Sequence, residues 1–194
     1  IVKVTGAELL EALEASTYCT PTSIGGFPQV SGIEFTVDTT KAYDQGEQYP
    51  GSTYYGPKTI NRVVINSVNG KEFKANEVYA VVTNNFCAAG GDTYYAFKAA
   101  SAQFDTGIPL DEAVMEYVTK ELKGAIGEQY AAPQGRITYF NPFKDVKTTS
   151  WYFNYMIHLY EDGVTKEAVM HAYNKIFRTE HGKRICAEMF GIEE

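Results

Sequence analysis

The sequence predicts an α+β fold, a mixed sheet with flanking helices, followed by a small all-α C-terminal appendage. Three observations lead to this prediction. The 194 residues are 44% hydrophobic and 21% charged, a composition typical of a packed globular protein rather than a disordered one. Strand-like alternation, interrupted by turn signals, continues to about residue 140, and helical patterning replaces it afterwards. We therefore place a boundary at residue 141, between a domain of residues 1–140 and a helical tail of residues 141–194.

The first predicted elements are a strand at residues 1–4 and a helix that begins after Thr5. Glu8 follows Thr5 by three residues, which is the spacing of a capping box. Three leucines then mark one apolar face and carry the helix to about Ser16. Because the sequence starts inside a predicted strand and without Met, we expect a fragment or a processed product with no signal peptide.

The middle of the chain predicts strands joined by turns. Residues 27–37 alternate in polarity and predict a strand, and residues 39–58, rich in Tyr, Gly and Pro, predict a long loop. Residues 60–68 predict the next strand, which ends at a hairpin turn at Asn69-Gly70. Residues 77–83, rich in Val and Tyr, predict another strand.

From residue 110 onward the sequence is mainly helical. Residues 110–123 predict a helix with acidic residues in its first turn and lysines in its last. Residues 135–140 predict the closing strand of the domain. Further helices are expected near residues 150–161, 166–178 and 180–190.

The net charge of −7 argues against nucleic-acid polymers and anionic membrane surfaces as main partners. It leaves room for a small anionic ligand, whose site depends on local charges. The sequence contains no apolar run of the ~18–20 residues that a membrane span needs.

Histidines and cysteines give no catalytic or metal-binding pattern. The three histidines lie in the tail and lack metal-ligand spacing, and neither a nucleophile elbow nor a phosphate-binding loop is present, so no catalytic residue and no metal site are predicted. The three cysteines are Cys19, Cys87 and Cys186. Their spacing is compatible with one disulfide or with buried or free thiols, and the sequence does not decide between them.

The stretch of residues 84–92 carries the candidate chemistry. A predicted strand ends close to Phe86, four small residues follow, and Asp92 closes the segment. An aromatic ring can stack on a base, small residues let the backbone approach a ligand, and a carboxylate can accept hydrogen bonds from two ribose hydroxyls. The alternative interpretation is a turn with Phe86 in the core and Asp92 capping the next helix.

Four segments of the sequence resemble the C-terminal domain of 5'-nucleotidases. They are residues 26–33 (Gly-Phe-Pro-Gln-Val-Ser-Gly-Ile), 81–86 (Val-Val-Thr-Asn-Asn-Phe), 90–92 (Gly-Gly-Asp) and 135–137 (Gly-Arg-Ile), in the order and spacing of that family. Members of the family are two-domain phosphohydrolases of nucleotides, including cyclic nucleotide phosphodiesterases. The resemblance covers residues 1–140 and implies an α/β domain that binds the nucleoside part of a nucleoside or nucleotide.

The resemblance also assigns roles to individual residues. It implies that Phe86 is one of two rings that sandwich the base, that Asp92 holds the ribose, and that Asn84 and Gly91 shape the loop. It further implies a divalent metal pair in an N-terminal metallophosphoesterase domain of the same protein. This sequence lacks that domain's metal ligands, so we expect the chain alone to be inactive. Family members of this kind are extracellular, periplasmic or associated with the bacterial cell wall.

The tail carries a second, partial resemblance. Residues 143–146, 151–152, 157, 159–160 and 163–164 are similar to the first half of a surface-layer homology module, although the loop between the module's halves is missing. This resemblance implies cell-wall contact through the tail, and it supports a second hypothesis, a non-catalytic cell-surface or wall-binding module. The alternative is a helical appendage that packs Trp151, Tyr155 and Leu159 against the domain or itself.

Overall fold

The computed structural model describes residues 1–143, 146, 150, 152–180 and 184, and these residues form two compact units. Unit 1 comprises Ile1–Val37 and Tyr43–Thr138. Unit 2 comprises Asp38–Ala42 and the described residues from Tyr139 onward. Helices occur together with small antiparallel sheets, so the predicted α+β class is confirmed.

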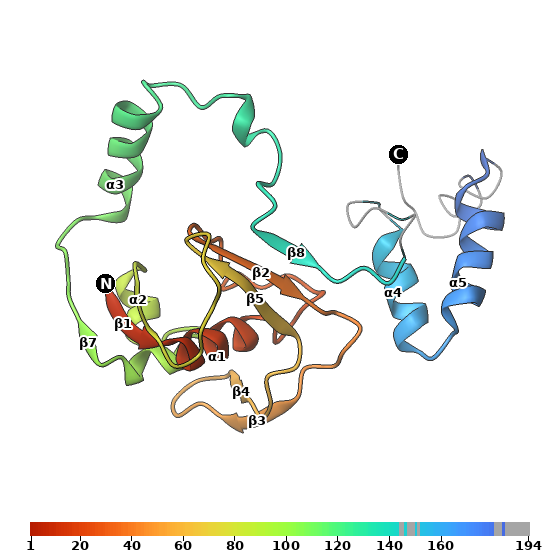
Figure 1. Cartoon of the computed structure of the whole chain (residues 1–194), viewed down its shortest axis with the longest axis horizontal. Helices are drawn as coiled ribbons and strands as arrows, with labels where there is room; N and C mark the ends of the chain where they lie inside the picture. Colours follow the sequence, from red (N-terminus) through yellow and green to blue (C-terminus); the bar gives the residue numbers. More distant parts are fainter. Residues whose placement is uncertain (144–145, 147–149, 151, 181–183, 185–194) are drawn as a thin grey trace. The chain divides into compact units, whose positions relative to one another are not determined.

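Unit 1 contains two three-stranded sheets, ordered β6-β1-β7 and β5-β2-β8, and the two-stranded ribbon β3-β4 (Figure 1). The strands are β1 (Val2–Thr5), β2 (Ile33–Val37), β3 (Gln45–Gln48), β4 (Tyr55–Pro57), β5 (Val63–Val68), β6 (Val78–Val81), β7 (Ala102–Gln103) and β8 (Ile137–Tyr139). The helical elements are α1 (Gly6–Ser16), α2 (Asn85–Ala88), the 3-10 helices η1 (Tyr95–Ala99) and η3 (Glu128–Tyr130), α3 (Leu110–Glu116) and the π-helix η2 (Tyr117–Glu121).

Helix α1 begins as the sequence predicts. The Glu8 amide donates to the Thr5 hydroxyl, 3.2 Å away, and the Glu8 carboxylate accepts the Thr5 amide at 2.7 Å, which completes the capping box. The helix buries Leu9, Ala12 and Leu13 in one core with residues from β1, β2 and β5. The core of unit 1 therefore forms between α1 and strands of both three-stranded sheets.

A buried carboxylate joins α1 to the start of β5. Glu14 is fully buried and accepts the backbone N–H groups of Arg62 and Val63 at 2.8–3.1 Å. The Arg62 guanidinium in turn donates to the carbonyl oxygens of Thr17 and Thr20, which follow α1. The backbone amides thus satisfy an acidic side chain that burial would otherwise penalise.

The turn at Asn69-Gly70 forms, but it does not join two paired strands. Both residues have positive φ, 50° and 71°, and Val68 forms a single bridge to Lys71. Beyond that bridge the strands separate, because β5 pairs with β2 whereas β6 pairs with β1. The predicted strands at residues 27–37 and 60–68 are also shorter than expected, since β2 starts at Ile33 and β5 at Val63.

The predicted long loop at residues 39–58 contains a hairpin, which corrects that prediction. Strands β3 and β4 pair antiparallel, with Gln48 opposite Tyr55. The tyrosines of this segment pack together: the Tyr43 hydroxyl donates to the Tyr55 carbonyl at 2.8 Å, and Tyr18 at the end of α1 stacks on Tyr55. Ring packing and not alternation of polarity holds this hairpin.

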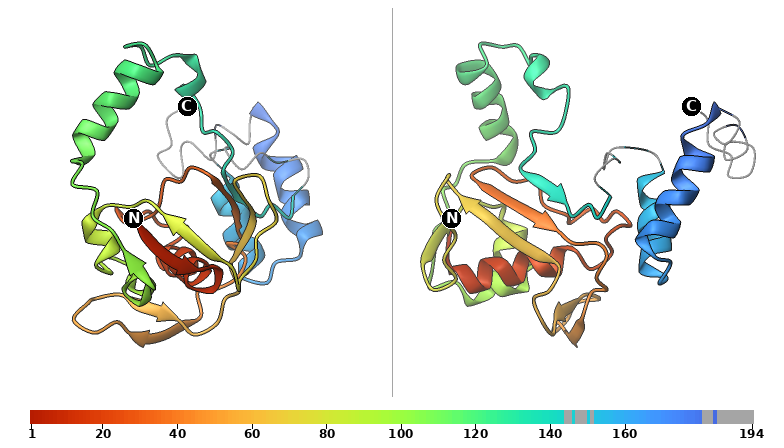
Figure 2. Two further views of the ribbon diagram at one scale, coloured as in Figure 1. Left: turned by 60° about the vertical axis from the view of Figure 1, so that its left-hand side comes forward. Right: turned by 45° about the vertical axis from the view of Figure 1, so that its right-hand side comes forward.

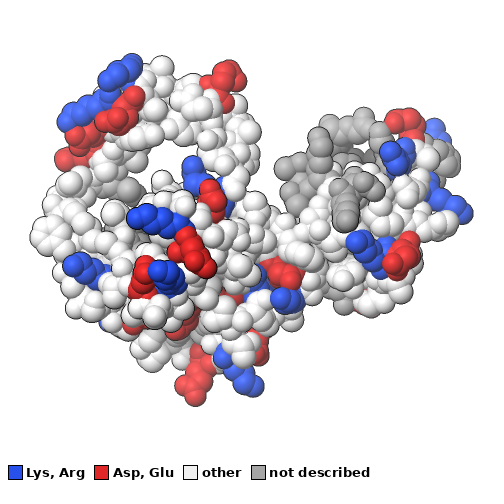
Figure 3. Space-filling view, in the orientation of Figure 1, with Lys and Arg blue, Asp and Glu red and all other residues white. Residues whose placement is uncertain are grey.

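Residues 104–136 form an arch that leaves the body after β7 and returns at β8, and it carries α3, η2 and η3 (Figures 1 and 2). Helices α3 and η2 together match the helix predicted at residues 110–123. The large apolar side chains of the arch are exposed, with Leu110 71% and Met115 66% accessible. On the face shown in Figure 3, acidic and basic side chains intermix on the arch and on the body.

Unit 2 has a helical core of its own. It contains α4 (Phe153–Glu161), α5 (Lys166–Ala172) and the π-helix η4 (Tyr173–Phe177). Its buried residues are Phe143, Val146, Phe153, Met156, Ile157, Val169 and Tyr173. Tyr155 and Leu159, which the alternative interpretation packs against the domain or the tail itself, are 42% and 38% exposed, whereas Phe153, Met156 and Ile157 of the same helix are buried.

Trp151 and most of the helix predicted at residues 180–190 lie outside the described residues, as does Cys186. Cys19 and Cys87 are free thiols. In the described part of the chain, the helices are too short or too polar to span a bilayer.

Candidate functional site

The candidate site is the loop of residues 84–92, which follows β6 and folds into the short helix α2 (Figure 1). Asn84 is the N-cap of this helix: its side-chain oxygen accepts the Cys87 amide at 2.8 Å. The Asn84 carbonyl also accepts the Ala88 amide at 3.0 Å. Asn84 therefore shapes the loop through its side chain and its backbone.

Phe86 is exposed, and its ring lies directly on Gly91. The Gly91 amide donates to the Phe86 carbonyl at 2.9 Å, which closes the loop. A β-carbon on Gly91 would lie 2.5 Å from the Cζ atom of the Phe86 ring, so a larger residue would have to displace the ring. The ring is 56% accessible, which leaves aromatic surface available to a ligand.

Asp92 directly follows Gly91 in the chain and has a left-handed backbone conformation, with φ of 49°. Its carboxylate packs on Gly26, where an added β-carbon would lie 2.9 Å from Asp92 Oδ2. The carboxylate is half-buried, and within the described residues it has no hydrogen bond and no ion pair. A carboxylate with no partner among the described residues, in the same loop as an exposed ring, is able to accept hydrogen bonds from vicinal hydroxyls.

The following residues fix Asp92 in place. Thr93 is fully buried, and the Tyr94 hydroxyl donates to the Gly26 carbonyl at 2.7 Å. Burial raises the pKa of Tyr94, with smaller contributions from Cys87 and Asp92, so this hydroxyl stays protonated as a donor. The loop of Gly26 and the loop of Asp92 are thereby held together.

The alternative interpretation of this segment is wrong on both points. Phe86 is not a core residue, because more than half of its surface is accessible. Asp92 does not cap the next helix, since η1 begins after Tyr94 and has no side-chain cap. Both side chains lack the structural role that the alternative assigned to them.

Comparison with known proteins identifies the domain that carries this loop. The sequence model of the 5'-nucleotidase C-terminal domain matches residues 1–99, more than half of the 194-residue chain. The chain belongs to this family. The matched region contains Asn84, Phe86, Gly91 and Asp92, so the four candidate residues fall within the family domain.

Two curated proteins and one solved structure are similar to this chain. The trifunctional nucleotide phosphoesterase protein YfkN of Bacillus subtilis is 34% identical over 78% of this chain, and the cell wall protein Lmo0130 of Listeria monocytogenes is 31% identical over 72%. A crystal structure of a 5'-nucleotidase precursor from Thermus thermophilus matches 72% of this chain with 29% identity and a TM-score of 0.51. The chain spans only 9% and 15% of the two curated relatives and 24% of the Thermus chain.

The described residues offer no site for the divalent metal pair that the resemblance places in a separate N-terminal domain. Within them, no group of three or more His, Cys, Asp or Glu side chains could hold a metal ion. Cys87, which lies within the loop, has a pKa raised mainly by burial, and this disfavours a thiolate ligand. No step of a metal-dependent reaction is therefore assigned to these residues.

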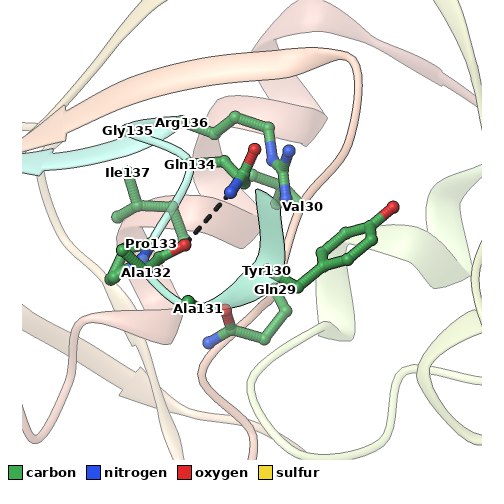
Figure 4. A pocket seen from close by; sticks show the side chains of 10 residues that line it. All are labelled: Gln29, Val30, Tyr130, Ala131, Ala132, Pro133, Gln134, Gly135, Arg136 and Ile137. Atoms are coloured by element: carbon green, nitrogen blue, oxygen red, sulfur yellow. Dashed lines mark hydrogen bonds between the residues drawn. The ribbon is translucent and has the colours of Figure 1, made fainter. Parts of the chain in front are cut away.

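A cavity of about 360 Å³ lies elsewhere in unit 1, where the arch returns to β8 (Figure 4). It is lined by Gln29, Val30 and residues 130–137, and the Gln134 amide folds back onto the Ala132 carbonyl at 3.0 Å. Arg136 lines it with its side chain, while its carbonyl accepts the Phe35 amide at 2.9 Å. The four candidate residues do not line this cavity, so the candidate site is an exposed loop surface.

The residues that pack against the loop of residues 84–92 and support it were not identified from the sequence. Gly26 belongs to the family segment at residues 26–33, but only the fold brings it against Asp92. Tyr94 and Lys98 lie on or next to η1, and their contacts with Gly26 and Gly90 likewise join segments that the sequence separates.

Proposed function

We propose that this chain is the nucleoside- or nucleotide-recognition domain of a 5'-nucleotidase or cyclic nucleotide phosphodiesterase-type hydrolase. The observation that carries the proposal is the pairing of an exposed Phe86 ring, seated on Gly91, with an Asp92 carboxylate that has no protein partner among the described residues. Phe86 stacks on the base, and Asp92 accepts hydrogen bonds from the ribose hydroxyls. The family and the phosphoesterase relative support this assignment.

In the proposal, the chemistry belongs to an N-terminal metallophosphoesterase domain that carries the divalent metal pair. The recognition domain contributes by holding the nucleoside, because binding energy from parts of the substrate remote from the reaction can orient the phosphate at the reacting centre. Asn84 and Gly91 act indirectly, through the shape of the loop.

The test is a titration of the full-length protein and its Phe86→Ala and Asp92→Ala variants with nucleosides. Base stacking on an aromatic ring is worth roughly 1–3 kcal/mol, so Phe86→Ala should raise Kd by about 5- to 150-fold. Asp92→Ala should cost a similar ~1.5–3 kcal/mol, because charge-assisted hydrogen bonds to the sugar are lost. The Phe86 change should affect all bases alike, whereas the Asp92 change should spare 2'-deoxy and 3'-deoxy analogues.

Two exposed residues of the arch provide matched controls. Phe104→Ala removes a ring that is 66% accessible, and Asp111→Ala removes an exposed carboxylate in the first turn of α3. Both should leave nucleoside binding unchanged. Normal binding by a folded Phe86→Ala variant would show that the ring does not contact the base.

We propose an extracellular or cell-wall location for the protein, which the cell-wall relative and the precursor 5'-nucleotidase support. The cell-wall relative also favours a second candidate function, a non-catalytic wall-binding module. Pelleting of the full-length protein with purified cell walls, compared with a variant that ends at residue 140, tests whether the tail carries such binding.

A further inference from the structure

A column of stacked side chains connects the hairpin β3-β4 to the back of the loop at residues 84–92. The rings of Tyr49 and Tyr95 are stacked, with centroids 4.7 Å apart and planes at 18°. The Lys98 ammonium lies 4.9 Å from the centroid of the Tyr95 ring. The column thus runs from Tyr49 through Tyr95 to Lys98.

The hairpin holds one end of the column firmly. Tyr49, which directly follows β3, is 7% exposed, and its amide donates to the Tyr54 carbonyl at 2.9 Å. Gly56 of β4 lies against the ring, since a β-carbon there would be 2.8 Å from Tyr49 Cε1. The ring is therefore enclosed by the hairpin and by Tyr95.

The other end of the column rests on the loop itself. A β-carbon on Gly90 would lie 2.6 Å from Lys98 Cγ and 3.3 Å from Tyr95 Cα, so the lysine stem and the η1 backbone press on Gly90. Gly90 has φ of +83°, and its amide donates to the Cys87 carbonyl at 2.9 Å. The next residue, Gly91, carries the Phe86 ring.

We propose that Tyr49, Tyr95 and Lys98 are positioning residues that hold Gly90 and Gly91, and through them Phe86 and Asp92, in the nucleoside-binding arrangement. This inference rests on the proposed function, which it deepens by extending the site to residues that do not touch the ligand. Through the column, the tyrosine-rich hairpin β3-β4 also contributes to nucleoside recognition, although it lies at the other end of the column from the loop.

In the column, Tyr49 acts through stacking of its ring and not through hydrogen bonding of its hydroxyl. The Tyr49 hydroxyl is buried and has no hydrogen-bond partner within the described residues, so the ring and not the hydroxyl makes the contact. Tyr49→Phe should therefore preserve the column. Likewise Lys98→Met keeps the stem on Gly90 and removes the charge, whereas Lys98→Ala removes both.

The experiment measures adenosine binding to the full-length protein carrying Tyr95→Leu or Lys98→Ala. Adenosine has no phosphate, so the loss of a lysine charge does not itself weaken binding. A stacked pair of this kind predicts a rise in Kd of about 2- to 12-fold. Tyr49→Phe and Lys98→Met should bind as the wild type does. Phe73→Ala, which removes a ring stacked on Tyr79 away from the column, is the matched control and should not change Kd.

A second measurement does not depend on the ligand. Amide hydrogen exchange of residues 84–92 should accelerate in Tyr95→Leu and Lys98→Ala and stay unchanged in Phe73→Ala, because only the first two release Gly90. Unchanged binding and exchange in both column variants would overturn the inference while leaving the proposed function intact. If the wild type binds no nucleoside, the proposed function fails, and unchanged exchange would then also overturn the positioning role.

Discussion

The Phe86 ring stays accessible because it lies at the surface on Gly91, which has no side chain to displace it. The sequence shows the ring and the small residues after it, and from these the stacking role of Phe86 can be predicted. The sequence does not show that the Asp92 side chain packs against Gly26, or that it lacks a hydrogen-bond partner among the described residues. Both facts depend on how loops that are distant in the sequence pack together. The sequence therefore proposes the candidate residues Phe86 and Asp92, whereas the packing around them becomes known only from the fold.

Glu11 provides a pH-dependent test of the packing around α1. Its pKa is raised, first by burial and then by the neighbouring Glu8, so ionisation of Glu11 disfavours the folded state. The folded protein thus loses stability as the pH rises through this raised pKa. We expect Glu11→Gln to raise Tm at about pH 7, and the gain to vanish at about pH 4, where both proteins carry a neutral side chain.

The control for this prediction has the opposite sign. The hydrogen bond from Lys120 lowers the pKa of Glu116 on α3, so Glu116 adds stability above its ordinary pKa and loses it on acidification. Glu116→Gln should therefore slightly lower Tm at about pH 7. A Glu11→Gln variant whose Tm differs from wild type equally at both pH values would contradict the burial of Glu11.

At the scale of elements, prediction succeeds where a short sequence pattern is sufficient to specify a helix or a strand. The capping box at Thr5 and Glu8 starts α1 as predicted, and alternation of Phe35 and Val37 identifies β2. The hairpin β3-β4 was not predicted, because the sequence of β3 is Gln-Gly-Glu-Gln, in which apolar and polar residues do not alternate. Its stability comes from tyrosine stacking on Tyr18 and Tyr95, contacts that only the fold creates.

The two units provide a prediction about independent folding. Unit 2 buries its own cluster, including Phe153, Met156 and Ile157, and unit 1 buries a separate one. We expect a chain that ends at residue 140 to keep the cooperative thermal unfolding of the α+β body, with Tm within a few degrees of the full chain. Calorimetry of both chains measures this. Loss of the transition on truncation, or a strand of the tail in the main sheet, would contradict the boundary.

At the scale of the whole molecule, recognition and chemistry are predicted to lie in different parts of the polypeptide. The chain covers 24% of the Thermus 5'-nucleotidase chain, and its described residues contain no metal-binding group. We therefore expect the purified 194-residue chain to show no hydrolysis of AMP, with or without added divalent metal. Phosphate release assays measure this, and metal-dependent turnover by a chain free of contaminating phosphatase would contradict the assignment.

The most direct test of the central claim is a crystal structure of the full-length protein with adenosine bound. The account predicts that the base lies face to face on the Phe86 ring and that the Asp92 carboxylate accepts hydrogen bonds from the 2'- and 3'-hydroxyls. Adenosine bound elsewhere, with the Phe86 ring and the Asp92 carboxylate free of ligand, would contradict it.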